Sequence, residues 1–146
     1  MNYSDNELIY EAYKSKEEKL YNSLSKDERE YLHCNRPYSD SRKYPNFVKR
    51  FKEFDENKNL KGYADLLRFS NKPKTLYITY AVSPNFRRQG VASRLIEKCK
   101  QFAIKNGFKL QYWADAKNDA SNAVAKKYNW PVIYDKSDKK GYNVTL

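Results

Sequence analysis

The spacing of apolar residues predicts two helices at the start of the chain. After Ser4 the apolar positions recur with the period of a helix to about Asn22, and a shorter helix follows Ser25. Both begin with the spacing of a capping box, a Ser followed three residues later by a Glu. Residues 33–45 are polar and rich in Pro and Ser, which predicts a loop.

The middle of the chain has the patterns of strands. Residues 48–54 and 61–69 flank a turn-rich linker and predict a β-hairpin, although the three phenylalanines of residues 47–54 would also line one face of a helix. Residues 75–82, TLYITYAV, are the clearest strand, because they are rich in β-branched and aromatic residues and lie between two prolines.

After Gly90 the period changes from strand to helix. Residues 91–106 carry apolar side chains on one face, and an Asn-Gly pair ends the helix. The remaining expected elements are a strand over residues 110–114, a short helix over 118–128, and a hairpin of residues 132–134 and 142–146. In the short helix, Ala120, Ala123 and Val124 are expected to face the core. The order α-α-β-β-β-α-β-α-β-β predicts a mixed α/β domain.

Charge adds a first functional indication. The chain carries a net charge of +11, while 40% hydrophobic and 16% aromatic residues are enough to build a core. The excess lies in the second half, because residues 73–146 hold 14 Lys and Arg against 5 Asp and Glu. This asymmetry favours an anionic partner such as a phosphate, a nucleic acid or an acidic surface.

Several classes of protein are disfavoured. No apolar run approaches the roughly 20 residues of a membrane span, and the first residues lack the pattern of a signal peptide. Cys34 and Cys99 are far apart and His33 is the single histidine, which argues against a disulfide framework and a metal site. We expect a reduced, soluble, cytoplasmic domain. His33 is expected to be a surface histidine, with an active-site role as the alternative.

The junction between the strand TLYITYAV and the next helix has the chemistry of an anion site. Pro84 ends the strand, Gly90 permits a left-handed backbone, and small Ala92 leaves the first helical turn open. A helix start presents free amide groups and a partial positive charge, to which Arg87 and Arg88 add theirs. The junction predicts a cradle for phosphate or pyrophosphate, and a turn with two solvated arginines is the alternative.

These residues resemble a known signature. The pattern Val82-x-Pro84-x-x-Arg87-x-x-Gly90-x-Ala92 resembles the acetyl-CoA-binding motif of the GNAT N-acetyltransferase superfamily at every defined position. The resemblance covers about residues 60–134, whereas residues 1–59 match only in the order of their elements, without an evident first strand.

The resemblance implies one GNAT-like domain over residues 1–146. It divides this domain into an acceptor region (1–59), a CoA-binding core (60–134) and a C-terminal hairpin (132–146). The implied fold is a mixed, mostly antiparallel sheet flanked by helices and splayed at the acyl-CoA site. The implied co-substrate is acetyl-CoA, without a metal.

The resemblance also implies roles for individual residues. Pantetheine would lie beside the strand end formed by Tyr80, Ala81 and Val82, with the Val82 amide stabilising the oxyanion. Asn118 would bond the pantetheine arm. The pyrophosphate would be held mainly by backbone amide groups of a longer run, which comprises Arg87, Arg88, Gln89, Gly90, Val91 and Ala92, with Ser93 nearby.

The groups that would move protons depart from the family pattern. The family often has a Tyr seven residues after the Asn, where this chain has Ala125. Tyr128, one turn further on, is the candidate acid, and a core aromatic that caps the helix is its alternative role. Lys127 and Trp130 do fit the pattern.

The general base is left open by the residues. The central strand contains no carboxylate, so the candidates are Asp115, Asp65 and a water chain that uses Tyr77 or Tyr80. Asp115 has an alternative role in capping the loop that follows it.

Three functions fit the sequence. The first is direct transfer of acetyl from acetyl-CoA to a primary amine of a small molecule, peptide or protein, by a monomer or homodimer away from the membrane. The basic surface favours neutral or anionic acceptors over polyamines. The second is a degenerate GNAT-like protein that binds CoA or a partner. The third is nucleic-acid modification or binding, which would use the basic and aromatic residues Arg42, Lys43, Tyr44, Phe47, Lys49, Arg50, Phe51 and Lys52.

Overall fold

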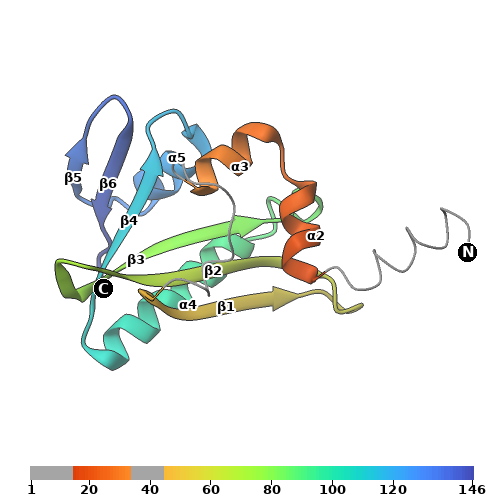
Figure 1. The fold of residues 1–146 in the computed structure, drawn as a ribbon, viewed down its shortest axis with the longest axis horizontal. Helices are drawn as coiled ribbons and strands as arrows, with labels where there is room; N and C mark the ends of the chain where they lie inside the picture. Colours follow the sequence, from red (N-terminus) through yellow and green to blue (C-terminus); the bar gives the residue numbers. More distant parts are fainter. Residues whose placement is uncertain (1–14, 34–44) are drawn as a thin grey trace, which may run out of the picture.

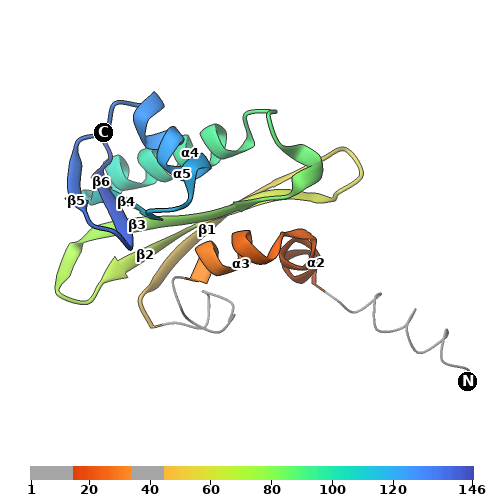
Figure 2. The ribbon, with the colours of Figure 1, turned by 90° about the horizontal axis from the view of Figure 1, so that it is seen from above.

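Two layers of helices enclose a six-stranded sheet in the part of the chain that the computed structural model describes, residues 15–33 and 45–146. In chain order the elements are α2 (Lys16–Ser23), α3 (Lys26–His33), β1 (Phe47–Phe54), β2 (Leu60–Phe69), β3 (Lys72–Val82), the 3-10 helix η2 (Pro84–Phe86), α4 (Val91–Asn106), β4 (Lys109–Asp115), α5 (Asp119–Lys127), β5 (Val132–Asp135) and β6 (Lys139–Asn143). Helices α4 and α5 cover one face of the sheet, and α2 and α3 lie against the other (Figures 1 and 2).

The sheet has the strand order β1-β2-β3-β4-β6-β5. Neighbouring strands are antiparallel except β3 and β4, which are parallel and joined through α4. The expected mixed, mostly antiparallel sheet flanked by helices is therefore confirmed. The β-hairpin expected around residues 48–69 is also confirmed, and its helical alternative is wrong.

Serine side chains cap α2 and α3, the first two helices of the described residues. Ser25 forms the expected capping box, since its hydroxyl accepts from the Glu28 amide at 3.2 Å and its amide donates to the Glu28 carboxylate at 2.9 Å. Helix α2 begins at a cap that sequence analysis missed, Ser15, whose hydroxyl accepts from the Glu18 amide at 3.0 Å. The capping box at Ser4 and most of the predicted loop lie outside the described residues. His33 ends α3 rather than beginning the loop.

The core lies mainly between α4 and the sheet. The buried face of α4 consists of Val91, Leu95, Ile96, Cys99 and Ala103, as its helical pattern predicts. A second, smaller cluster joins α2 to the other face of the sheet and consists of Leu20, Leu24, Leu60, Tyr63 and Ala81. Both faces of β2 and β3 are therefore covered, which fixes β3, one of the two strands that border the site.

The buried face of α5 differs from the prediction. Ala120 and Ala123 are exposed and Val124 is half-buried, whereas Asn122 and Ala125 are buried. The polar Asn122 is buried because its amide donates to the carbonyl oxygens of Asp115 at 3.1 Å and Asn118 at 2.9 Å, and its side-chain oxygen accepts from the Tyr142 hydroxyl at 2.6 Å. A prediction that selects the buried face of a helix by its apolar residues alone does not find a buried polar residue such as Asn122.

The C-terminal hairpin is confirmed with a shifted second strand. Strand β6 runs from Lys139 to Asn143, three residues earlier than the expected start, and pairs with both β4 and β5. Gly141 lies under the indole of Trp113, and a Cβ at this position would come within 2.8 Å of the ring. The absence of a side chain at Gly141 therefore lets Trp113 lie close to the sheet.

A buried ion pair joins β1 to β2. Asp65 is fully buried and accepts from Nε and Nη2 of Arg50 at 2.6 and 2.7 Å. The Arg50 guanidinium also lies 4.3 Å from the centre of the Tyr63 ring. Arg50 is thereby engaged inside the protein, and the partly exposed Lys52 lies 2.6 Å from Glu17. These two cations are bound to carboxylates rather than presented to a nucleic acid.

Replacing Asp65 by Ala is expected to lower the free energy of unfolding by about 3–5 kcal/mol, because it leaves the buried Arg50 guanidinium without its carboxylate. Urea denaturation measures the change. Asp135→Ala is the control, since Asp135 is exposed and lies 4.0 Å from Lys140, a surface pair whose loss is expected to cost less than about 1 kcal/mol. Equal losses in the two variants would contradict the assignment of Asp65 as a buried structural partner.

Candidate functional site

The sheet opens between its two parallel strands. Pairing of β3 with β4 runs from Thr75↔Lys109 to Ile78↔Tyr112 and stops there. Beyond this point β3 continues to Val82 beside β2, and β4 continues to Asp115 beside β6. Figure 1 shows β4 turning away from β3. The predicted splay is therefore present.

The backbone of β3 faces the opening at alternate residues. The Ser83 amide donates to the Lys61 carbonyl of the β2 side at 2.8 Å. Because the hydrogen-bonding groups of successive strand residues point in opposite directions, Val82 and Tyr80 turn theirs away from β2. Their amide and carbonyl groups are thus directed toward the space between β3 and β4.

A cleft of about 740 Å³ occupies this opening, a size typical of ligand pockets, which span about 300–1,000 Å³. Its lining includes most of the cofactor residues predicted from the sequence. These are Tyr80, Ala81, Val82, Arg87, Arg88, Gly90, Val91, Ala92, Ser93 and Asn118. The candidate base Asp115 also lines the cleft, whereas Gln89, Asp65, Tyr77 and Tyr128 are not part of the lining.

The turn before α4 has two left-handed residues. Gly90 caps the helix with a φ of 76°, and Arg88 has a φ of 62°. The Gly90 conformation is the one that its residue type predicts. With this backbone, the first amide groups of α4 face the cleft end lined by Gly90, Val91 and Ala92. The positive end of a helix therefore lies at this end of the cleft.

Arg94 braces this turn, a role that sequence analysis missed. Its Nη1 donates to the Gln89 carbonyl at 2.8 Å, and its Nε and Nη2 donate to Glu53 on β1 at 2.7 and 2.8 Å. The Arg94 hydrogen bond is the main cause that holds the pKa of Glu53 below its usual value. A sequence signal did exist, since Arg94 follows Gly90 by one helical turn, but nothing in the sequence pairs it with Glu53.

Arg87 is engaged by α3. Its guanidinium forms an ion pair with Glu28, and Nη2 also donates to the Val82 carbonyl at 3.4 Å. Partial burial raises the pKa of Glu28, but hydrogen bonds from Ser25 and the charge of Arg87 outweigh it, and the net pKa is lowered. Glu28 is therefore a carboxylate bound to one of the two arginines predicted to meet pyrophosphate.

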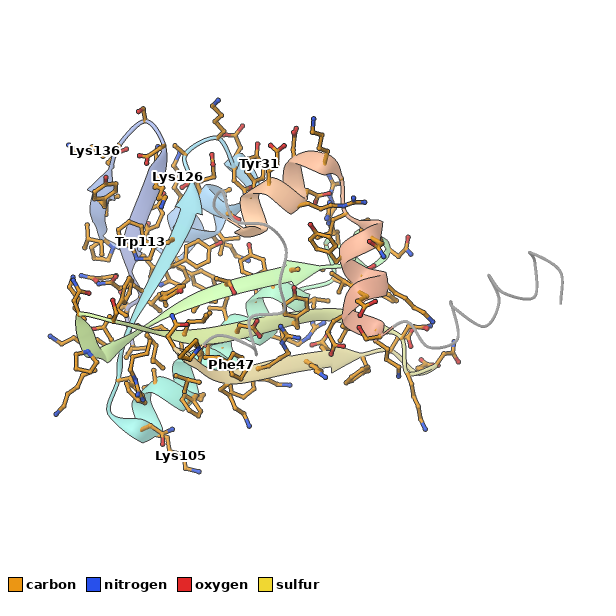
Figure 3. All side chains as sticks on the ribbon, in the orientation of Figure 1. Tyr31, Phe47, Lys105, Trp113, Lys126 and Lys136 are labelled. Carbon is orange, nitrogen blue, oxygen red and sulfur yellow. The ribbon has the colours of Figure 1, made fainter. Side chains whose placement is uncertain are left out.

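The loop between β4 and α5 forms the opposite wall. Asn118 is the N-cap of α5, and its side-chain oxygen accepts from the Ser121 amide at 3.2 Å. Asp115 accepts from the Lys117 amide at 2.9 Å, so it does have the predicted loop-capping contact. Tyr31 of α3 donates to the Lys117 carbonyl at 3.5 Å. In Figure 3, Tyr31 lies where α3 approaches this wall.

Two tyrosines meet where the strands part. The hydroxyl groups of Tyr80 and Tyr112 lie 3.0 Å apart, and their rings are stacked with centroids 6.0 Å apart. Tyr112 is almost wholly buried, and this burial, followed by the influence of Tyr80, raises its pKa well above the usual value. Sequence analysis named Tyr80 but missed Tyr112, which the expected strand contained without a motif to mark it.

The candidate acid Tyr128 lies elsewhere. It caps the end of α5, and its ring is stacked on Trp130 with a centroid distance of 4.9 Å. Ala125, at the position where the family often has a Tyr, is completely buried. The other tyrosine considered, Tyr77, packs against Phe69 on β2 at 4.8 Å.

The cysteine and the metal-ligating side chains of the described residues form no second candidate site. Burial, with a smaller contribution from Asp65, raises the pKa of the Cys99 thiol to about 12, so this thiol is not a nucleophile at neutral pH. Cys34 lies outside the described residues. Within residues 15–33 and 45–146, no three His, Cys, Asp or Glu side chains are grouped to hold a metal ion. None of the described helices is long and apolar enough to cross a membrane.

Comparisons with known proteins place this fold among acetyltransferases. The chain belongs to the Acetyltransferase (GNAT) family, whose family model matches residues 7–130. This family uses acetyl-CoA. No curated protein matches the sequence significantly.

Solved structures share the fold. A protein from Acinetobacter baylyi described as an acetyltransferase has 20% identity and a TM-score of 0.59, over 69% of this chain and 64% of that one. An N-acetyltransferase from Staphylococcus aureus has 25% identity and a TM-score of 0.53, over 62% and 63%. A Salmonella typhimurium acetyltransferase solved with acetyl-CoA has 19% identity and a TM-score of 0.53, over 63% and 61%. This chain therefore spans less than two thirds of each of these proteins.

Replacing Glu28 by Gln is expected to strengthen CoA binding about two- to fivefold. The substitution removes the carboxylate that competes with phosphate for Arg87, and the size of the effect is that of a surface ion pair. Glutamine can still complete the capping box with Ser25. Calorimetric titration with CoA at low salt measures the affinity. Glu97→Gln is the matched control, because it removes the same charge from the outer face of α4. Equal affinities in the two variants would show that Glu28 does not compete for Arg87.

Proposed function

We propose that this protein is an N-acetyltransferase that moves the acetyl group of acetyl-CoA directly to a primary amine. The observation that supports this most is the cleft at which β3 and β4 part, with the starts of α4 and α5 on its two sides. Strand edges that face a cleft can bind an extended amide-bearing chain by backbone hydrogen bonds. Bound acetyl-CoA supplies a thioester, that is, an activated acyl group with a thiolate leaving group.

The phosphate end of the cofactor would lie at the start of α4. The amide groups of Gly90, Val91 and Ala92 and the charge of Arg88 are suited to phosphate oxygens, with Ser93 nearby. Gln89 would support the turn rather than contact the phosphate, because its carbonyl accepts from Arg94 at 2.8 Å. Arg87 would join when it leaves Glu28. The positive end of the cleft would therefore bind the most negative part of the cofactor.

The acyl end would lie beside β3. The Val82 amide, directed into the opening, is suited to hydrogen-bond the acetyl oxygen as negative charge develops on it. Asn118 lines the opposite wall, where it can meet the pantetheine arm. Asp115 is the candidate carboxylate that lines the cleft, whereas Asp65 is buried against Arg50. Asp115 therefore stays the predicted acceptor of the amine proton.

Gly90→Glu is expected to abolish CoA binding, because it places a side chain and a negative charge at the proposed phosphate position. Gly107→Glu is a matched control at the other end of the same helix, since Gly107 has a similar φ of 72° and open space around it. Both variants carry the backbone strain of a left-handed residue, about 1–2 kcal/mol. Calorimetry with CoA and thermal unfolding separate binding from stability.

The proposal is tested by release of free thiol from acetyl-CoA with a panel of amines. The wild type and Gly107→Glu are expected to turn over, and Gly90→Glu is not. Equal CoA binding by the two glycine variants would contradict the proposed phosphate site. CoA binding without turnover on any amine would instead support a CoA-binding protein without catalysis.

We place the acceptor at the cleft wall formed by α3 and the β4–α5 loop, where Tyr31, Asp115 and Asp119 are part of the lining. The local charge at this acceptor side differs from the net charge. Burial and then the charges of Asp27, Asp115, Asp119 and Glu30 raise the pKa of Tyr31, which lines the cleft. The cleft wall there also includes the indole of Trp113 on β4 (Figure 3). Carboxylates beside aromatic rings favour a cation. We therefore propose an acceptor with a second positive charge, in place of the neutral or anionic acceptor that the net charge favours.

Three amines of equal chain length test this choice. Putrescine carries a second ammonium, butylamine carries none, and γ-aminobutyrate carries a carboxylate in its place. The ratio kcat/KM is expected to fall in that order, by about three- to tenfold at each step, in line with weakly screened surface charges. A preference for γ-aminobutyrate would contradict the proposed acceptor class and leave the acetyltransferase proposal standing.

A further inference from the structure

Two tyrosine hydroxyl groups are hydrogen-bonded at the point where β3 and β4 part. The Tyr112 hydroxyl donates to the Tyr80 hydroxyl at 3.0 Å. Tyr80 is part of the lining of the cleft. The hydrogen bond therefore ends on a residue that can meet a bound ligand.

Burial determines the direction of this hydrogen bond. Tyr112 is 1% exposed, so bulk water does not accept its hydrogen, and the Tyr80 hydroxyl is the acceptor within reach. Each hydroxyl has one hydrogen, so the hydrogen of Tyr112 goes to Tyr80. The half-buried Tyr80 keeps its own hydrogen, which can point into the cleft.

The packing around Tyr112 holds this arrangement in place. Tyr112 is 1% exposed, and its ring packs against Trp130 at 5.2 Å and Tyr142 at 6.2 Å. The Tyr142 hydroxyl donates to Asn122 of α5 at 2.6 Å, which ties the same helix to the sheet. Because Tyr112 is surrounded, its hydroxyl has one orientation toward Tyr80. A hydroxyl that accepts such a bond becomes a stronger donor itself.

We propose that Tyr80 donates the proton that the departing CoA thiolate takes up, and that Tyr112 positions it. This inference rests on the proposed function. The amine nitrogen forms a bond to the acetyl carbon as the carbon–sulfur bond breaks. The Tyr80 proton goes to the sulfur, and the amine proton goes to Asp115 or to water. Water in the open cleft then returns a proton to the Tyr80 phenolate.

The position of Tyr80 suits this task. It lies two residues beyond the last β3–β4 pair and two residues before Val82, on the strand that borders the opening. Residues two apart on a strand share a face and lie about 6.6 Å apart. The reactive thioester, if its oxygen meets the Val82 amide, therefore lies within reach of the Tyr80 side chain. Neither Ala125 nor Tyr128 brings a hydroxyl to the lining of the cleft.

The first measurement needs no turnover. A hydrogen bond from Tyr80 stabilises the thiolate of bound CoA, so it lowers the pKa of that thiol. The pKa is measured from the ultraviolet absorbance of the thiolate in a pH titration of the protein saturated with CoA. Tyr80→Phe is expected to raise it by about one unit, and Tyr112→Phe by a smaller amount. Tyr128→Phe is the matched control and is expected to leave it unchanged.

The second measurement is the rate of acetyl transfer. Tyr80→Phe is expected to lower kcat about 100-fold, the usual contribution of a general acid, with CoA affinity within twofold of the wild type. A Tyr80→Phe protein that keeps the wild-type thiol pKa, or a Tyr128→Phe protein that raises it, would overturn the assignment. A shifted thiol pKa without turnover on any amine would support the placement of Tyr80 at the thiol and overturn the proposed function instead.

Discussion

The end of pairing between β3 and β4 is the constraint on which the site depends. Two parallel strands can part without leaving their outer edges bare only if each has another partner. Strand β3 stays paired with β2 up to Val82, and β4 stays paired with β6 up to Asp115. The inner edges then face a cleft rather than a core, where water or a ligand can satisfy their backbone groups. The opening between β3 and β4, which an extended cofactor would occupy, therefore follows from the strand order.

The turn at the start of α4 shows how the first part of the described chain supports this cleft. Left-handed Arg88 and Gly90 would allow several paths for the backbone. Arg94 selects one path by holding the Gln89 carbonyl on one side and Glu53 on the other. Glu53 belongs to β1, which lies in the part of the sequence that resembles the family only in the order of its elements. This strand therefore supplies the carboxylate that holds Arg94. The shape of this turn therefore depends on a residue of a distant strand as well as on the motif.

Periodicity was enough to predict the order of elements and the buried face of α4, because each depends on residues close together in the chain. The pattern at Gly90 likewise marks a local backbone need. Long-range partners could not be predicted, since Arg50 meets Asp65 and Arg94 meets Glu53 only when the strands and α4 assemble. Two cations counted toward a nucleic-acid surface, Arg50 and Lys52, are therefore bound to carboxylates. The face of α5 was wrong for the same reason, as Asn122 is anchored by Tyr142.

Helix α3 links the two walls of the cleft. Glu28 contacts Arg87 on the α4 side, and Tyr31 contacts the Lys117 carbonyl on the α5 side. These two residues are three apart on one helix, so they share a face. Under the proposed function, a phosphate that draws Arg87 away from Glu28 would remove the contact of α3 with the α4 side and leave the contact with the Lys117 carbonyl. The proposed phosphate and acceptor ends of the cleft would then be connected through α3. The excess positive charge includes Arg87 and Arg88 in the lining of the cleft, whereas the exposed Lys105 and Lys136 are not part of that lining.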